Sequence, residues 1–354
     1  MTIPEYKYHS TGQFRNAVKN IQMKAKFKGV DEDGNAIIDE TAMAPSLNYT
    51  GTVKLHGTNA SVIVHDNQTI TFNSKARTLA TLTQLEGFVL HSDNAEFAQS
   101  MYRREAQLDT LLTQAENLCL TEYGCIKYPI KISGEWAGQG VQKGVGISFL
   151  PKKSFFVFGV KVEDEWHNSS TLDLKGLEDS GVYNIYDFPV QHVCIDFSNA
   201  AYSQNALVKA TEAVEEECPV SKQLGITESL LGEGLVWIPE DKELAKDSGN
   251  WFKTKGEKHS VSKVKSVAAV CPEKLDSIKE FVEYACTPNR MQQGVDEVGL
   301  DQKSIGSFIG WVSKDINKEE GDVLEVNNLT MKDVGKYIAT ESRKFYLQLL
   351  SGDV

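Results

Sequence analysis

One segment of the sequence carries residues that could form a covalent intermediate. Residues 52–60 read TVKLHGTNA, so Lys54 ends an apolar strand, a tight polar turn follows, and a second apolar strand starts at Ser61. A neutral lysine amine is a nucleophile. Lys54 is therefore a candidate catalytic residue, and the alternative is an ordinary surface lysine at a hairpin.

The Lys-x-x-Gly spacing at Lys54 carries little information by itself, because the sequence contains ten copies of it. They begin at Lys26, Lys54, Lys131, Lys143, Lys222, Lys246, Lys253, Lys303, Lys318 and Lys332. The copies at Lys318 and Lys332 fall in polar or helical stretches. Only Lys54 combines the spacing with a strand–turn–strand pattern and with a His, a Thr and an Asn in the turn. Its sequence context therefore makes Lys54 the best candidate nucleophile among the ten lysines.

Further charged residues follow in order along predicted strands. The segment SKAR (74–77) closes one strand with two cations, Glu135 lies near the end of another, and Glu233 precedes the strand GLVWI (234–238). Lys253 and Lys255 lie two apart on a strand and so point to the same face. Each could be a solvated strand end. Together they supply a nucleophile, cations for phosphates, and two carboxylates for a metal or a ribose, which is what nucleotidyl transfer needs.

In this order, the residues resemble the nucleotidyltransferase motifs of the covalent ligase and mRNA-capping superfamily. The segments KLHGTN (54–59), GEWAGQGVQKGV (134–145) and EGLVWIP (233–239) are similar to the RNA ligase 2 family of bacteriophages and to the RNA-editing ligases. The resemblance spans residues 54–255. It implies ATP as a cofactor with Mg²⁺, for which Mn²⁺ could substitute, and RNA as a partner.

The resemblance also implies roles for the charged residues. Lys54 would attack the α-phosphate of ATP and hold AMP as a phosphoramidate. Lys253 and Lys255 would bind the α-phosphate. Glu135 would bind the ribose and Glu233 would serve the metal.

The resemblance also implies which other residues would lie next to the bound nucleotide. His56 and Asn59 would lie beside the phosphate, Arg77 would contact the nucleotide or a 5′-phosphate, and Phe158 would stack on adenine. The residues flanking the lysine, Val53 and Leu55, would also border the nucleotide.

The chain departs from the family pattern in three places. Gly159 stands where the family often has Asp, and Val53 replaces the Glu that often precedes the lysine in phage members. The interval from Lys54 to Arg77 is also longer than in phage members.

The chemistry is consistent with these residue types. A nearby Mg²⁺, Lys253 and Lys255 would disfavour the ammonium form of Lys54. The metal would neutralise charge on the phosphates while the lysines stabilise the in-line transition state. One site would then serve enzyme adenylylation, transfer of AMP to a 5′-phosphate, and attack by a 3′-hydroxyl.

The net charge of −12 and the pI of about 5.2 argue, at face value, against a nucleic-acid partner. The distribution of charge suggests otherwise, because residues 252–265 carry five lysines against one glutamate. We expect RNA contacts there, with a solvated linker as the alternative. The candidate RNA-binding residues are Lys143, Lys258, Lys263 and Lys265, and Lys131, Lys152 and Lys153 could extend the groove.

The pattern of elements predicts an α+β protein of two domains. Residues 1–260 would form an antiparallel-sheet nucleotidyltransferase domain of the ATP-grasp-like ligase type. Residues 261–354 would form a small all-helical domain that docks the RNA substrate, with the boundary near 256–272. Apolar spacing predicts helices around 275–285, ended by Pro288, and around 305–316 and 334–349.

Several classes of protein are excluded or disfavoured. No apolar run approaches the length that spans a bilayer, and the N-terminus has no signal pattern. The six cysteines are scattered without CxxC pairs, and the seven histidines form no evident metal cluster. We therefore expect a cytoplasmic monomer with free thiols and no membrane partner.

The leading hypothesis is an ATP-dependent RNA ligase that seals 3′-hydroxyl and 5′-phosphate ends, such as those of a nicked duplex, in RNA repair. One alternative is a DNA ligase or a GTP-dependent capping enzyme, although those families usually carry Asp where His56 stands. Another is a catalytically silent RNA-binding protein with the ligase fold, which would need a broken motif.

Overall fold

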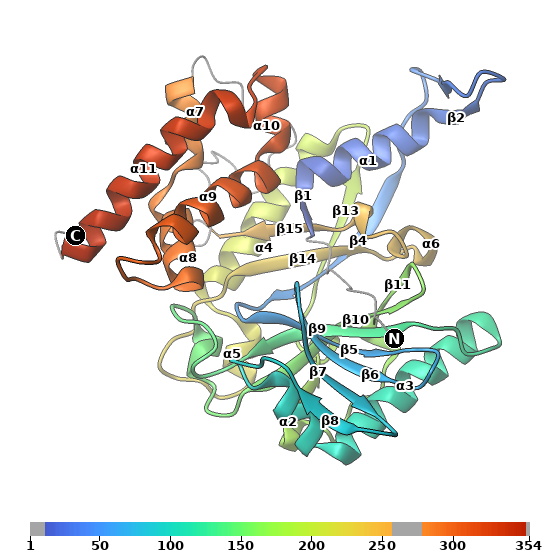
Figure 1. Ribbon diagram of the computed structural model, residues 1–354. Helices are drawn as coiled ribbons and strands as arrows, with labels where there is room; N and C mark the ends of the chain where they lie inside the picture. The colour runs from blue at the N-terminus through green and yellow to red at the C-terminus, as the bar shows by residue number, and fades with distance from the viewer. Residues whose placement is uncertain (1–10, 257–277, 352–354) are drawn as a thin grey trace.

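The computed structural model describes residues 11–256 and 278–351 (Figure 1). Its strands form two antiparallel-rich sheets, and its last helices form a separate cluster in the C-terminal part. The α+β architecture with a helical C-terminal region is thus confirmed. The expected domain boundary after residue 260 lies outside the described residues.

The larger sheet has the strand order β11-β10-β9-β5-β6-β7-β8, and β12 pairs with β10. Neighbouring strands are antiparallel except for the parallel pair β10–β12. The strands are β5 (Thr58–Val64), β6 (Ile70–Ser74), β7 (Thr78–Thr83), β8 (Gly87–Leu90), β9 (Ile130–Ala137), β10 (Ser154–Val162), β11 (Glu165–Asn168) and β12 (Val182–Asn184). A core of apolar side chains from this sheet packs against helices α2 (Phe97–Arg103) and α3 (Glu105–Tyr123).

The second sheet has the order β1-β15-β14-β4-β13. Its strands are β1 (Gly12–Gln13), β4 (Ser46–Lys54), β13 (Gln191–Asp196), β14 (Gly234–Pro239) and β15 (Phe252–Lys255). Only β1 runs parallel to its neighbour, β15, among the described pairs. Helices α1 (Phe14–Lys26) and α4 (Gln204–Glu216) bury apolar side chains in the core of this sheet.

Short elements complete this part of the chain. Strands β2 (Phe27–Val30) and β3 (Ala36–Ile38) form a separate hairpin around a turn at residues 31–35. Helices α5 (Pro219–Gln223) and α6 (Lys242–Ala245) lie in the connections around β14. Two strands that are adjacent in sequence, β4 and β5, belong to different sheets, so the turn between them joins the two sheets.

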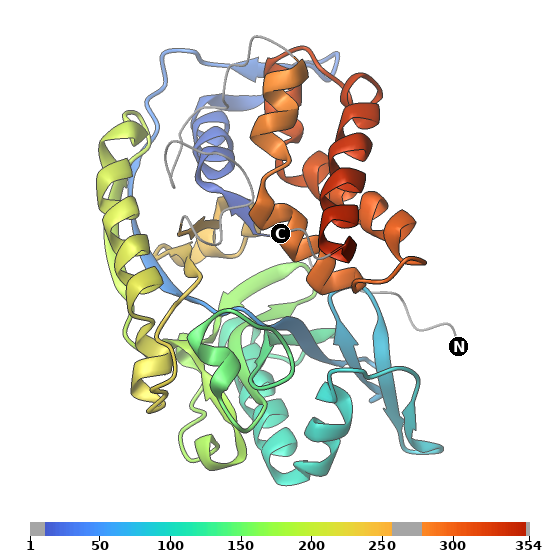
Figure 2. The same cartoon turned by 90° about the vertical axis from the view of Figure 1, so that its left-hand side faces the viewer.

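Within residues 278–351, five helices form the C-terminal cluster around a core of their own. They are α7 (Ile278–Ala285), α8 (Pro288–Val298), α9 (Ile305–Glu319), α10 (Gly321–Val326) and α11 (Met331–Ser351). In Figures 1 and 2 they group beside α1, at the end of the molecule opposite α2 and α3. The prediction that Pro288 ends a helix is wrong: α7 already stops at Ala285, and Pro288 occupies the first turn of α8, where its missing N–H costs nothing.

No helix among the described residues is long and apolar enough to cross a membrane. The five cysteines in the described ranges, Cys119, Cys125, Cys194, Cys218 and Cys286, are free thiols, as predicted.

Candidate nucleotide-binding active site

Strand register brings three charged residues to one point, where the second sheet meets the turn to β5. Gly234, the first residue of β14, lies directly opposite both Lys54 on β4 and Lys255 on β15. Glu233 precedes that glycine and so lies between the two lysines. The backbone of Gly234 has φ +148°, and a Cβ there would lie 2.1 Å from the carbonyl oxygen of Thr254, so only glycine fits next to Glu233.

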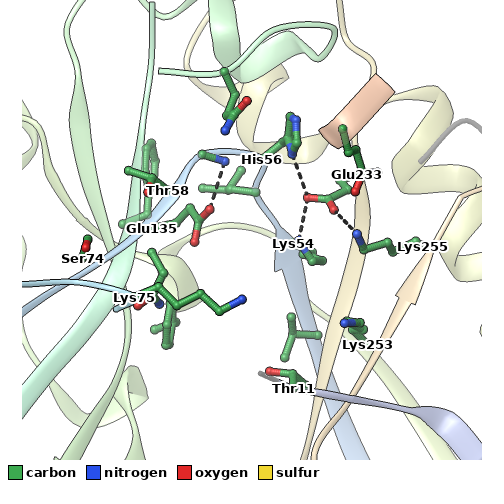
Figure 3. Close-up of a pocket in the computed structure, with 18 of the residues that line it drawn as sticks. Thr11, Lys54, His56, Thr58, Ser74, Lys75, Glu135, Glu233, Lys253 and Lys255 are labelled. Carbon is green, nitrogen blue, oxygen red and sulfur yellow. Dashed lines mark hydrogen bonds and ion pairs between the residues drawn. The ribbon is translucent and has the colours of Figure 1, made fainter. Parts of the chain in front are cut away.

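The Glu233 carboxylate is buried and binds cations on both oxygens. Its Oε2 lies 2.6 Å from Lys54 Nζ and 3.5 Å from His56 Nδ1, and its Oε1 lies 2.9 Å from Lys255 Nζ (Figure 3). Burial would raise the pKa of Glu233, but the charges of Lys255 and Lys54 and the contact with His56 hold it well below its usual range. The carboxylate therefore stays ionised and fixes both lysines.

The second predicted carboxylate, Glu135, lies across the cleft on β9. Its Oε1 accepts a hydrogen bond of 3.0 Å from the backbone N–H of Gly57. A Cβ at Gly57 would lie 2.3 Å from the carbonyl oxygen of Trp136, so the glycine of the Lys-x-x-Gly segment allows the β4–β5 turn to approach β9 this closely. The glycine thereby connects the lysine and the carboxylate of the site.

The ionisation of Glu135 differs from that of Glu233. Burial is the largest cause and, with the nearby negative charge of Glu233, raises the pKa of Glu135 to about 7, although Lys54 and the Gly57 N–H act in the opposite direction. Asn59 lies opposite Glu135 in the β5–β9 register, and its buried side-chain oxygen has no hydrogen-bond partner among the described residues. A carboxyl group and an amide oxygen are thus available to a polar ligand.

Lys253, the remaining predicted phosphate-binding residue, is paired with a residue of the helical region. Its Nζ lies 3.0 Å from both carboxylate oxygens of Glu319, at the end of α9. Burial and the charges of Lys255 and Lys54 lower the pKa of Lys253, whereas Glu319 raises it. The same ion pair lowers the pKa of Glu319, against the effect of burial. The sequence interpretation did not include Glu319.

The predicted adenine-binding residue Phe158 is half-buried on β10 and faces the cleft. Phe156, two residues earlier on the same strand, also borders the cleft and stacks on Tyr183 with ring centroids 5.0 Å apart. Val53 and Leu55, which flank the nucleophile candidate, are buried and border the same space. This part of the cleft is apolar, as a purine base requires.

These groups surround a cleft of about 560 Å³. Every predicted catalytic and nucleotide-binding residue borders it: Val53, Lys54, Leu55, His56, Asn59, Arg77, Glu135, Phe158, Glu233, Lys253 and Lys255. The helical region borders it as well, through Gln293, Glu297, Trp311, Asp315, Lys318 and Glu319. This second group could not be recognised from the sequence, because most of its members are polar or charged residues typical of a solvated helix face.

The candidate RNA-binding residues lie elsewhere or outside the described chain. Lys143 is exposed between β9 and β10 and does not border the cleft, and Lys258, Lys263 and Lys265 lie outside the described residues. The lysines suggested as an extension of the RNA groove do not border this cleft. Lys131 is buried on β9, Lys152 donates to the carbonyl of Asp179, and Lys153 pairs with Glu96 at 2.7 Å.

The donor set fits a divalent cation that arrives with phosphates. No group of three or more His, Cys, Asp or Glu side chains suited to hold a metal occurs within residues 11–256 and 278–351. Magnesium, however, is typically bound by one or two carboxylates together with substrate phosphates and water. Glu233 and Glu135, with the unpartnered oxygen of Asn59, supply oxygens of that kind.

Comparison with solved structures gives matches to an RNA ligase of Naegleria gruberi. A lysine-to-methionine mutant with AMP and Mn has a TM-score of 0.43 and 14% identity, over 71% of this chain and 57% of that one. The same ligase with PPi has a TM-score of 0.42 and 15% identity, over 71% and 57%. This chain therefore matches less than two thirds of the length of those structures. A comparison with curated proteins gives no match.

A family model gives the decisive result. The model described as RNA ligase matches residues 48–255, which is more than half of the chain and runs from within β4 to the end of β15. The matched range starts just before Lys54 and ends at Lys255, the two lysines that share Glu233. The chain belongs to the RNA ligase family.

Proposed function

We propose that the protein is an ATP-dependent RNA ligase that joins 3′-hydroxyl and 5′-phosphate ends through a lysyl-AMP intermediate. The observation that carries this proposal is the buried Glu233 carboxylate held between Lys54 and Lys255, at the edge of a cleft with an apolar wall. The fold would be the ATP-grasp-like ligase type, with a nucleotidyltransferase domain up to residue 260 and an RNA-docking helical domain from residue 261.

The cleft accommodates ATP in a defined orientation. Adenine would stack on Phe158 against the apolar wall that includes Val53 and Leu55. Glu135 would accept a hydrogen bond from the ribose. The α-phosphate would then lie at Lys54, within reach of Lys253 and Lys255.

The first reaction step forms one bond and breaks one. The Lys54 amine releases a proton to solvent, and its lone pair attacks the α-phosphorus. The bond to the oxygen bridging the α- and β-phosphates breaks, and pyrophosphate leaves with that electron pair. Lys253 and Lys255 stabilise the charge on the α-phosphate oxygens during this step. A divalent cation bound with the phosphates would supply further charge neutralisation.

The ion pair with Glu233 holds the candidate nucleophile in place. Lys54 Nζ lies 2.6 Å from Glu233 Oε2. To attack the α-phosphorus, the amine would have to leave this contact. A cation drawn to the Glu233 carboxylate would weaken it, which links the predicted metal-binding residue to activation of Lys54.

The later steps use the same residues. AMP passes from Lys54 to the 5′-phosphate of an RNA end, and a 3′-hydroxyl then displaces AMP to form a phosphodiester. His56 and Asn59, which border the phosphate side of the cleft, are positioned to act in these steps, and Arg77 at the cleft mouth would contact the 5′-phosphate. We expect the protein to work as a monomer.

The proposal is tested by incubating the purified protein with ATP labelled in the α-phosphate and Mg²⁺. We expect a labelled protein that survives denaturation at alkaline pH and loses its label in acid, as a phosphoramidate does. Lys54→Ala should abolish the label. The matched control is Lys303→Ala, which changes an exposed lysine with the same Lys-x-x-Gly spacing and should leave the label unchanged.

Substrate comparison separates the alternatives. Sealing of nicked RNA with ATP, without sealing of nicked DNA or use of GTP, is the expected result. A GTP requirement would indicate a capping-type enzyme. Binding of nicked RNA without any protein adduct would contradict the ligase proposal and support a silent RNA-binding protein.

A further inference from the structure

Two cations at the mouth of the cleft lie on the turn between β6 and β7. Lys75 and Arg77 both border the cleft, and neither has a carboxylate within ion-pair distance among the described residues. Figure 3 shows the Lys75 side chain reaching from the Ser74 side of the cleft toward Lys54. By contrast, Lys54 and Lys255 are paired with Glu233, and Lys253 is paired with Glu319.

A further cation faces Lys75 from the helical region. Lys318, near the end of α9, borders the same cleft, and its Nζ lies 3.6 Å from Glu319 Oε1. Partial loss of water around the Lys75 amine, together with the charges of Lys318 and Lys253, lowers the pKa of Lys75 to about 8, while Glu319 acts in the opposite direction. Two lysines from different parts of the chain are thus held close together although their charges repel each other.

We propose that Lys75 and Lys318 form a second phosphate-binding subsite, built jointly by the β6–β7 turn and helix α9. It is distinct from the α-phosphate position at Lys253 and Lys255, and as a role in ligation it rests on the function proposed above. An anionic group between the two amines would remove their mutual repulsion and gain two charge-assisted hydrogen bonds. The ligand is therefore the phosphate group of a polyanion.

Two sources can supply that phosphate within the cleft. One is the polyphosphate tail of ATP, which leaves as pyrophosphate. The other is a phosphate of the RNA strand whose 5′-end is being adenylylated. Either source gives the helical region a direct part in binding substrate, since Lys318 belongs to α9.

The first experiment measures pyrophosphate binding to the full-length protein by calorimetry. Lys75→Ala and Lys318→Ala should each weaken binding about tenfold or more, as expected for loss of a charged hydrogen bond. Lys314→Ala is the matched control, because Lys314 is an exposed lysine of the same helix that does not border the cleft. Equal affinities for all three variants and the wild type would overturn a subsite for the ATP tail.

The second experiment measures sealing of RNA that already carries AMP on its 5′-end, which bypasses ATP. If the subsite serves RNA, Lys75→Ala and Lys318→Ala raise the KM for this RNA about tenfold while Lys314→Ala does not, and pyrophosphate binding is unaffected. If the subsite serves ATP, sealing of this RNA is unchanged and pyrophosphate binding is weakened. No effect in either assay overturns the subsite.

A proton-linked measurement adds a readout that a purely structural defect would not produce. Because a bound phosphate favours the charged form of Lys75, binding of the ligand should take up a proton near pH 8, and the affinity should fall as the pH rises above 8. Calorimetry in two buffers of different ionisation enthalpy detects this uptake. Lys75→Ala should abolish it. Pyrophosphate calorimetry needs no ligase turnover, so it distinguishes failure of this subsite from failure of the proposed function.

Discussion

At the scale of single residues, the raised pKa of Glu135 makes the unfolding free energy of the protein depend on pH. Its pKa is raised from 4.5 to about 7, mainly by burial, so the folded protein holds a proton that the unfolded chain has already released. The contribution of Glu135 to stability is therefore complete below pH 4.5 and is lost as the pH rises toward 7.

We predict that Glu135→Gln removes this pH dependence. Between pH 5 and pH 8, the wild type should lose on the order of 2–3 kcal/mol of unfolding free energy through Glu135, and the variant should not. Urea denaturation at the two pH values measures the difference. Glu86→Gln, at an exposed glutamate near the same sheet, should behave as the wild type does. A wild type and Glu135→Gln that change in parallel would contradict the prediction.

The residues of the nucleotide side of the site could be predicted because strand ends and glycines mark them in the sequence. Lys54, Glu135 and Glu233 each stand at such a position, and the structure brings all three to one cleft. Lys318 and Glu319 could not be predicted. The sequence around them, NKEEGD, is typical of a solvated helix end, and only the docking of α9 on the sheets places both residues at the cleft.

At the scale of elements, helix α9 contributes a carboxylate to a site otherwise made of strands. Lys253 and Glu319 are mostly buried, with side chains 14% and 11% exposed. Burial of a lysine without a counter-charge is unfavourable, so Glu319 is what allows Lys253 to remain charged in the absence of ligand.

We predict that Glu319→Gln destabilises the protein by about 2–3 kcal/mol at pH 7, because it leaves the Lys253 charge unpaired. The pKa of Glu319 is lowered from 4.5 in the folded state, so its contribution is present above pH 4.5 and lost on acidification. Because the loss begins below pH 4.5 and is complete only at the much lower pKa of the folded state, the wild type and the variant should still differ at pH 4.5 and converge only in strong acid.

Urea denaturation at pH 7, pH 4.5 and about pH 3 provides this measurement, and the difference should shrink only between the last two. Glu325→Gln, at an exposed position in α10, is the control and should change stability by less than about 0.5 kcal/mol. Equal stability of Glu319→Gln and the wild type at pH 7 would show that the ion pair makes no net contribution.

The strongly patterned elements could be predicted, and the short ones could not. The apolar strands β4, β5 and β9 and helix α9 form where the sequence pattern predicts a strand or a helix. Strand β11 has only four residues, and α10 has six, so neither repeats a pattern long enough to be recognised. These elements depend on the partners beside them.

At the scale of the whole molecule, a buried cluster of charged side chains joins helix α1, near the start of the described chain, to the C-terminal helices. Glu320 is fully buried and binds Arg15 at 3.3 Å, Arg290 at 2.9 Å and the hydroxyl of Tyr284 at 3.0 Å. Arg15, on α1, also binds Asp322 at 2.5 Å. This cluster fixes the corner between α9 and α10, and with it the position of Glu319 at Lys253.

We predict that Arg15→Ala destabilises the protein by about 3–5 kcal/mol, because it leaves Glu320 and Asp322 with uncompensated negative charge. Guanidinium denaturation measures this change. Lys19→Ala, at an exposed position of the same helix, is the control. Equal stability of Arg15→Ala and the wild type would contradict the prediction. The appearance of a separate, earlier transition for the helical region would show that this region unfolds independently of the rest.

The parallel pairing of β1 with β15 has a consequence for biosynthesis. Gly12 pairs with Phe252 and Gln13 pairs with Lys253, and Arg15 binds a residue 307 positions further along the chain. A ribosome makes the N-terminal segment long before these partners exist, and contacts between residues so far apart in sequence form slowly. Lys253 therefore gains its partner Glu319 only after translation has passed α9, so a shorter nascent chain lacks that side of the cleft.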